Sequence, residues 1–316
     1  MYQQPPHLSK RKTGMIFCLA ASAILLLFSP DQALAWGGGI HLQLGVSVLN
    51  NLTLFSPDLA AILANHPRDF LYGCVSADIT LGKKFTHYML NCHRWRIGRK
   101  LLQAARTDSQ RACAHGYLCH LAADVIAHNY YVPYKIMHSF AAVTMKHAYW
   151  EMRFETFVDK EVWETAREVC RADQRANDDL MRSVLANTLF SFGTNKRIFN
   201  SIMMLSRLEK WQQVMQTLSN NSRYVLAESE REEFYLMTEA AIFQFLQREG
   251  DSELLESDPT GERALAMAEA VRKNLKLLYK NGRLTKAEGM EQVELLRVKL
   301  RQALDRPELL SEIYSG

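Results

Sequence analysis

One stretch of the sequence places three polar groups at four-residue intervals in an otherwise apolar run, His120-Leu-Ala-Ala-Asp124-Val-Ile-Ala-His128. Residues four apart project from one face of an α-helix, so the two imidazoles and the carboxylate share a face. A packed core does not need such a face, because burying a polar group without a partner costs free energy. A second segment, His147-Ala-Tyr-Trp-Glu151, has the same spacing. Imidazole and carboxylate are ligands that zinc prefers, so both segments predict helices that carry metal ligands.

Helical signals run through the whole chain, whereas the alternation of β-branched and polar residues expected of strands is nearly absent. Ser56 followed by Pro57 predicts a helix that reaches about residue 65. Pro133 is expected to end a long helix, and Ser229 is expected to open a later one through a capping box. The other predicted helices span residues 94–106, 110–131, 138–171, 258–281 and 285–304, with a short one from 307. The predicted fold is therefore an all-α bundle of many helices.

Residues 1–35 have the pattern of a signal peptide. A basic stretch at 10–12 precedes an apolar run at 15–28, and a small-residue cleavage site follows at 33–35. The apolar run is shorter than the roughly 20 residues of a transmembrane helix. We therefore expect export, to the periplasm or out of the cell, with a mature chain that begins at Trp36. An uncleaved membrane anchor is the alternative.

The net charge and the cysteine content limit the class of protein that the chain can be. The net charge is +4, and residues 1–35 carry +2 of it, so the mature chain carries only +2. This near balance does not favour a nucleic-acid-binding protein. Five cysteines follow residue 35, an odd number, and we expect most of them to be buried small apolar residues. Every histidine lies at or before His147, which assigns an imidazole-rich site to the first half of the mature chain.

With four earlier residues, the two helical segments form an ordered series of possible zinc ligands: Trp36, His41, Asp78, His87, His120, Asp124, His128, His147 and Glu151. This series resembles the zinc-dependent phospholipase C family, which shares its fold with single-strand-specific fungal nucleases. The resemblance covers roughly residues 36–160. It implies a phospholipase C/nuclease-like helical domain at 36–171, with the helices of 172–316 as a C-terminal extension that packs on it.

The resemblance implies up to three zinc ions. The first is held by the amine and carbonyl of Trp36 with His41 and Asp124. The ligands of the second are Asp78, His87, His120 and again Asp124, which bridges the two ions. The ligands of the third are His128, His147 and Glu151. The resemblance also implies that Asp78 acts as general base or orients the attacking water.

What the resemblance implies about activity is an exported phosphodiester hydrolase, a phospholipase C that acts on phospholipid headgroups and touches the membrane surface transiently. The Glu at position 151 favours the phospholipases. The short step from Trp36 to His41 is closer to the nucleases, so a single-strand nuclease or nucleotidase is the alternative. A third hypothesis is a non-catalytic helical binding protein that zinc stabilises. No acidic residue stands four positions from His93, His115 or His138, and we expect these three to be structural or exposed.

Overall fold

The computed structural model describes residues 37–80, 92–142, 147–185, 190–207, 212–213, 217, 226–248, 251–306 and 309. The predicted signal peptide, Trp36, His87 and the helix expected from residue 307 lie outside these residues. The first half of the described chain contains α2 (Gly38–Asn50), η1 (Leu52–Leu54), α3 (Pro57–Asn65), α4 (Pro67–Ser76), η2 (Ala77–Ile79), α5 (Trp95–Ala104), α6 (Asp108–Ile126), η5 (Ala127–Tyr131), α7 (Val132–His138) and α8 (His147–Glu155). The second half contains α9 (Lys160–Arg171), α10 (Arg175–Val184), α11 (Phe192–Ser206), α13 (Glu228–Arg248), η6 (Glu253–Glu256), α14 (Glu262–Lys280) and α15 (Lys286–Asp305). No strand occurs among the described residues, and the prediction of an all-α fold is confirmed.

Several helix ends lie where local chemistry predicts them. Ser56 caps α3, its hydroxyl accepting a hydrogen bond from the Leu59 amide. Thr285 and Glu288 form the reciprocal capping box that opens α15. Gly282 follows the end of α14 with a φ of +67°, a conformation that costs glycine little.

Other predicted ends are wrong. The helix expected from residue 258 begins instead at Glu262, because the Asp258 carboxylate bonds to Thr260 and forms a turn that ends at Gly261. No Ser229 capping box forms, because α13 already begins at Glu228; only Glu230 reaches back, to the Ala227 amide. The single helix predicted over 138–171 is divided into α8 and α9 by residues 156–159.

Pro133 does not end the long helix that carries His120, Asp124 and His128. The backbone continues from α6 through the π-helical segment η5 into α7, and Pro133 lies in the first turn of α7. Proline is tolerated in a first turn, where its missing N–H removes no required hydrogen bond. The wider π-helical turn makes the transition, and such turns are frequent at functional sites. His128 lies in this segment.

Helix α6 is at the centre of the core and is buried over most of its length. It packs most closely on α4, and two glycines make that contact possible. A Cβ at Gly73 would lie 2.0 Å from the carbonyl oxygen of Cys113, and a Cβ at Gly116 would lie 2.0 Å from that of Phe70. The two backbones therefore meet where no side chain fits.

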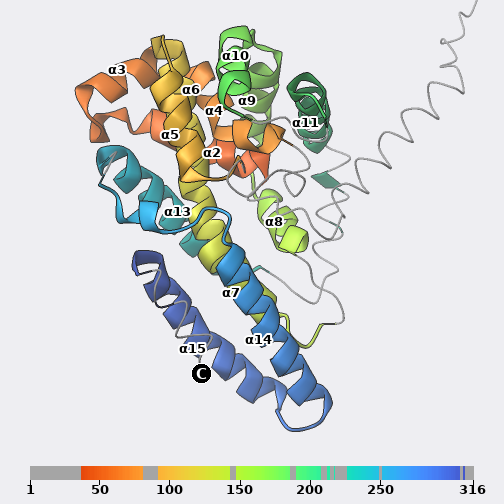
Figure 1. The fold of residues 1–316 in the computed structure, drawn as a ribbon. Helices are drawn as coiled ribbons and strands as arrows, with labels where there is room; N and C mark the ends of the chain where they lie inside the picture. The colour runs from red at the N-terminus through yellow and green to blue at the C-terminus, as the bar shows by residue number, and fades with distance from the viewer. Residues whose placement is uncertain are drawn as a thin grey trace, which may run out of the picture. The chain divides into compact units, whose positions relative to one another are not determined.

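The C-terminal helices cover the same long helix. Helix α13 packs along α6, while α14 and α15 pack along η5 and α7 (Figure 1). Buried charge contributes to this contact: Lys135 of α7 is fully buried, and its Nζ lies 2.7 Å from Oε2 of Glu230. The Tyr134 hydroxyl donates to Glu294 of α15 at 2.7 Å. Within the described ranges, no helix has both the length and the apolar composition required to span a membrane.

Candidate metal centre

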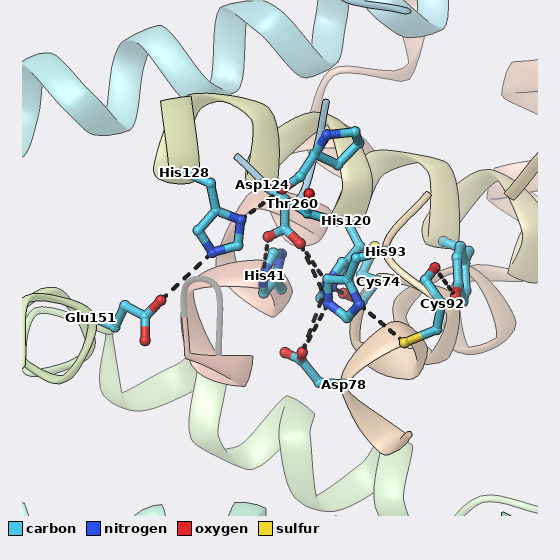
Figure 2. A network of polar contacts seen from close by, with 12 residues as sticks. His41, Cys74, Asp78, Cys92, His93, His120, Asp124, His128, Glu151 and Thr260 are labelled. Carbon is cyan, nitrogen blue, oxygen red and sulfur yellow. Dashed lines mark hydrogen bonds and ion pairs between the residues drawn. The ribbon is translucent and has the colours of Figure 1, made fainter. Parts of the chain in front are cut away.

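Asp124 lies at the centre of a buried group of imidazoles and is itself fully buried. Its Oδ1 is 3.5 Å from Nε2 of His41. Its Oδ2 is 3.3 Å from Nε2 of His120 and 3.4 Å from Nε2 of His93 (Figure 2). The two oxygens of one carboxylate thus face different histidines, as a bridging metal ligand requires.

A second carboxylate, Asp78, closes the other side of the group. Its Oδ1 is 3.2 Å from Nε2 of His93 and 4.0 Å from Nε2 of His120. We call these five residues, His41, Asp78, His93, His120 and Asp124, the central cluster. Two triads within it have ligand atoms that all lie within 4.8 Å of one another, His41/His120/Asp124 and Asp78/His93/His120.

The central cluster draws on four separate segments of the chain. His41 belongs to α2, and Asp78 belongs to η2, directly after α4. His93 precedes α5, while His120 and Asp124 are one turn apart on α6. The Nδ1 atom of His120 lies 2.9 Å from the carbonyl oxygen of Cys74 and donates to it, which leaves Nε2 unprotonated toward the cluster in the neutral ring. The packing of α4 on α6 therefore also orients this imidazole.

The buried polar atoms of the central cluster fit a cation. Nε2 of His41 and both carboxylate oxygens of Asp124 have no hydrogen-bond partner, although all are buried. Burial, reinforced by the neighbouring His120, lowers the pKa of His41 to about 3, so this ring is neutral and its nitrogen is available. Burial alone would raise the pKa of Asp124, but the charge of the neighbouring His120 holds it at about 2. A neutral imidazole beside a buried carboxylate anion is a donor set that zinc binds.

His128 and Glu151 form a separate pair, which we call the outer pair. Nε2 of His128 is 3.7 Å from Oε1 of Glu151, and both side chains are buried. Burial raises the pKa of Glu151 to about 8. The other ring nitrogen of His128, Nδ1, donates to the carbonyl oxygen of Pro259 at 2.7 Å. The outer pair thus depends on a residue of the C-terminal half.

Of the nine predicted ligands, the structure brings His41, Asp78, His120 and Asp124 together and pairs His128 with Glu151. His147 begins α8, one turn before Glu151, but its side chain is outside the described residues, as are Trp36 and His87.

The sequence analysis missed His93. We expected it to be structural or exposed, yet it is 2% exposed and its Nε2 faces Asp78, His120 and Asp124. An acidic residue four positions away indicates a metal ligand only when both residues lie on one helix. The carboxylates that His93 meets belong to η2 and α6, so this spacing does not apply to it. No local signal in the sequence marks this residue.

A second residue that the sequence analysis missed is Glu155, which holds the start of α2. Its Oε1 accepts from the Gly39 amide at 2.8 Å and its Oε2 from the Ile40 amide at 3.3 Å. Both amides lie in the first turn of a helix, where a carboxylate is favourable. A Cβ at Gly37 would lie 2.2 Å from Oε2 of Glu155, so glycine is required for this approach. Burial raises the pKa of Glu155 to about 7.

The cysteines contribute no disulfide within the described residues. Cys74, Cys113 and Cys119 are buried and Cys170 is half-buried, all as free thiols, and Cys92 is buried as well. This agrees with the expectation that most of them serve as small apolar residues. Cys92 also lies against the central cluster, with its Sγ 3.1 Å from Nδ1 of His93.

Comparison with known proteins identifies the family. Residues 40–191 match the model of the family described as zinc dependent phospholipase C, a segment that contains the central cluster and the outer pair. No curated protein and no solved structure matches the chain. The zinc dependence in the family's description and the buried donor set agree on zinc. Over this segment, just under half of the chain, the protein matches the zinc-dependent phospholipase C family, and it is a zinc-dependent hydrolase of that class.

Proposed function

We propose that the protein is an exported phospholipase C that hydrolyses the phosphodiester bond between diacylglycerol and the phosphorylated headgroup of a phospholipid. The observation that carries the proposal is Asp124, a fully buried carboxylate whose two oxygens face His41 on one side and His93 and His120 on the other. Buried charge of this kind is destabilising unless a cation or a hydrogen-bond donor compensates it.

In this proposal the central cluster holds two zinc ions and the outer pair holds a third. His41 and Asp124 would bind the first, with the terminal amine and carbonyl of Trp36. Asp78, His120 and Asp124 would bind the second, together with His93, His87 or both. The outer pair would bind the third with His147. Zinc lowers the pKa of bound water toward about 7 and polarises a phosphoryl oxygen.

The chain's own groups would then handle the proton. Asp78 is proposed to accept a proton from the attacking water as the water oxygen bonds to phosphorus. The bond from phosphorus to the glycerol oxygen breaks, and that oxygen takes up a proton. The products are diacylglycerol and the phosphorylated headgroup, so atoms and charge balance.

The test uses the mature chain, beginning at Trp36 and loaded with zinc. Incubation with phosphatidylcholine should release diacylglycerol. A chelator should abolish the release, and added zinc should restore it. The same preparation is incubated with single-stranded DNA, because the short step from Trp36 to His41 resembles the nucleases. DNA digestion without diacylglycerol release would replace the lipid by a nucleic acid as the substrate.

Export is a separate part of the proposal, supported by the signal-peptide pattern of residues 1–35. Expression of the full chain in a bacterium with an outer membrane, followed by fractionation, tests it. We expect protein in the periplasm or the medium whose first residue is Trp36. Protein that keeps residues 1–35 and stays with the membrane would instead support an uncleaved anchor.

Contact with a membrane surface is supported by the hairpin of residues 270–287, where α14 turns into α15 (Figure 1). Between Glu269 and Glu288 the sequence has no acidic residue and six basic ones, Arg272, Lys273, Lys276, Lys280, Arg283 and Lys286. Three large apolar side chains are exposed among them, Leu277 at 59%, Leu278 at 37% and Tyr279 at 39%. Exposed apolar groups flanked by cations are typical of segments that bind an anionic bilayer.

Co-sedimentation with vesicles tests this surface. Replacement of Lys280, Arg283 and Lys286 by Gln should weaken binding to phosphatidylserine-containing vesicles by about fivefold per charge, because each cation near such a surface contributes about 1 kcal/mol. The control removes equal charge from the exposed face of α5, by the same replacement of Arg96, Arg99 and Lys100. Equal weakening in both variants would show that only net charge matters.

A further inference from the structure

We infer that the segment Ser257–Gly261, which we call the strap, positions His128 for metal binding. The strap connects η6 to α14 and lies outside the 40–191 segment that matches the family. The inference rests on the proposed function in one respect, the role of His128 as a zinc ligand. It gives a function to a part of the C-terminal half.

The strap contacts two consecutive residues of the π-helical segment. The Pro259 carbonyl oxygen accepts from Nδ1 of His128 at 2.7 Å, and the Asp258 carbonyl oxygen accepts from Nδ2 of Asn129 at 2.8 Å. A carbonyl oxygen only accepts hydrogen bonds, so the His128 proton must be on Nδ1. In the neutral ring, Nε2 is then the unprotonated nitrogen, and it is the one directed at Glu151. A carbonyl that orients a histidine in this way is a recurring partner of metal-binding imidazoles.

The strap is also tied to the segment that carries His93. Nε1 of Trp95 donates to the Ser257 carbonyl oxygen at 2.8 Å. The guanidinium of Arg94, the residue after His93, lies 2.9 Å from Oδ2 of Asp258. The strap therefore connects the outer pair with one edge of the central cluster. The contacts on both sides are hydrogen bonds to backbone carbonyl groups or an ion pair.

Gly261 allows this close approach. Its φ is +58°, and a Cβ there would lie 2.4 Å from both the Cβ and the carbonyl oxygen of His128. Gly282 provides a matched control, because its φ is +67° but a Cβ there would meet nothing within 4 Å. Alanine at either position imposes the same backbone strain, and only at Gly261 does it also displace the strap from His128.

The experiment compares G261A and G282A in the full mature chain. Zinc content and zinc affinity are measured by elemental analysis and by competition with a chelator, alongside the thermal stability of the zinc-free proteins. Both variants should lose stability from the positive φ, and G261A should lose more, because its Cβ also meets His128. G261A should in addition lose one zinc ion per chain, or bind its weakest zinc about 10- to 100-fold less tightly. Equal zinc binding by G261A and G282A would overturn the inference.

A second readout does not depend on zinc. In the zinc-free protein, at a pH where the His128 ring is neutral, its ¹⁵N resonances should show the proton on Nδ1, and G282A should retain this tautomer. In G261A, or in D258N if G261A does not fold, the Nδ1 proton should exchange with water at least tenfold faster. A His128 ring protonated on Nε2 in the unmodified protein would also overturn the inference. Failure of the proposed function is distinguishable, because it would appear as absent zinc binding with the Nδ1 tautomer intact.

Discussion

The central cluster and the outer pair differ in how the chain assembles them. The central cluster takes its side chains from residues 41–124, and its pivot is a regular α-helix on which His120 and Asp124 are one turn apart. The outer pair takes His128 from the π-helical segment and Glu151 from α8, and His128 is held by Pro259. The described members of the first site therefore all lie within the family-matched segment, whereas the second also depends on the C-terminal half.

This difference shows where the four-residue spacing rule applies and where it fails. Four residues place two side chains on one face while the hydrogen bonds run from i to i+4. They no longer do so in a π-helical turn, where the bonds run from i to i+5. His128 is four residues after Asp124, yet it pairs with Glu151 and Pro259 rather than with the central cluster.

The largest effect that we expect comes from Asp124→Asn, which removes the bridging charge of the central cluster. The variant should lose two zinc ions while the outer pair retains its metal. Diacylglycerol release should fall by about 10³-fold, since a bound metal contributes several kcal/mol of transition-state stabilisation. The control is Asp178→Asn, another buried carboxylate, which bonds to Lys196 and Tyr72. The control should keep all its zinc; equal zinc content in the two variants would contradict the assignment.

His93→Ala tests whether His93, which no local signal in the sequence marks, is a zinc ligand of the central cluster. We expect zinc affinity at the central cluster to fall by about 10- to 100-fold, as measured by chelator competition. His115→Ala is the matched control, because His115 is also buried but belongs to neither candidate triad. Its effect should be confined to stability. If His93→Ala binds zinc as tightly as His115→Ala does, His93 is not a ligand.

Glu155→Gln tests how α8 connects the outer pair with the central cluster. Helix α8 carries Glu151 of the outer pair, and it also carries Glu155, whose carboxylate holds the start of α2. The Glu155 pKa is raised to about 7, above its value of about 4.5 in the unfolded chain. The folded protein therefore binds more protons than the unfolded chain between these values, and the zinc-free protein loses stability as pH rises from about 4.5 to 7. Glutamine should reduce this loss by about 1–3 kcal/mol.

Chemical denaturation of the zinc-free protein at pH 5 and pH 7 measures this pH-dependent loss of stability. The quantity compared is the change in unfolding free energy between the two pH values. Exposed Glu161, replaced by Gln, is the control and should leave that change as it is. A Glu155→Gln variant with the pH dependence of the unmodified protein would show that the carboxyl titrates at its ordinary pKa.

The smallest effect should come from Arg94→Gln, which breaks the ion pair with Asp258 but leaves the Pro259 carbonyl in place. A partly exposed ion pair contributes up to about 1 kcal/mol, so zinc affinity at the outer pair should fall by fivefold at most. Exposed Arg99, replaced by Gln, is the control. A loss as large as that of G261A would mean that Arg94, rather than the strap backbone, positions His128.

Much of the fold could be predicted because helices carry local signals. Ser56 and Pro57 mark the start of α3, and Thr285 with Glu288 marks the start of α15. The predictions failed where a distant contact outweighs a local preference. Pro133 would end an isolated helix, yet here α14 and α15 pack around η5 and α7, and the helix continues.

The candidate site, like the fold, could be predicted only where its residues are related by a local spacing. His120 and Asp124 are on one helix, so their spacing indicated a shared face. His93, Glu155 and Pro259 act across separations of 15 to 131 residues, and no interval in the sequence relates them to the groups they contact.

Local patterns of residues were sufficient to predict a helical chain, and the family resemblance of its ligand series indicated zinc. Capping residues and four-residue spacings act over one helical turn and are therefore visible in the sequence. Only the tertiary structure decided that Asp124 faces histidines on two sides, that His93 joins them, and that a C-terminal carbonyl orients His128. These features depend on directional contacts between remote segments, and such contacts exist only once α4, α6 and the C-terminal helices have packed.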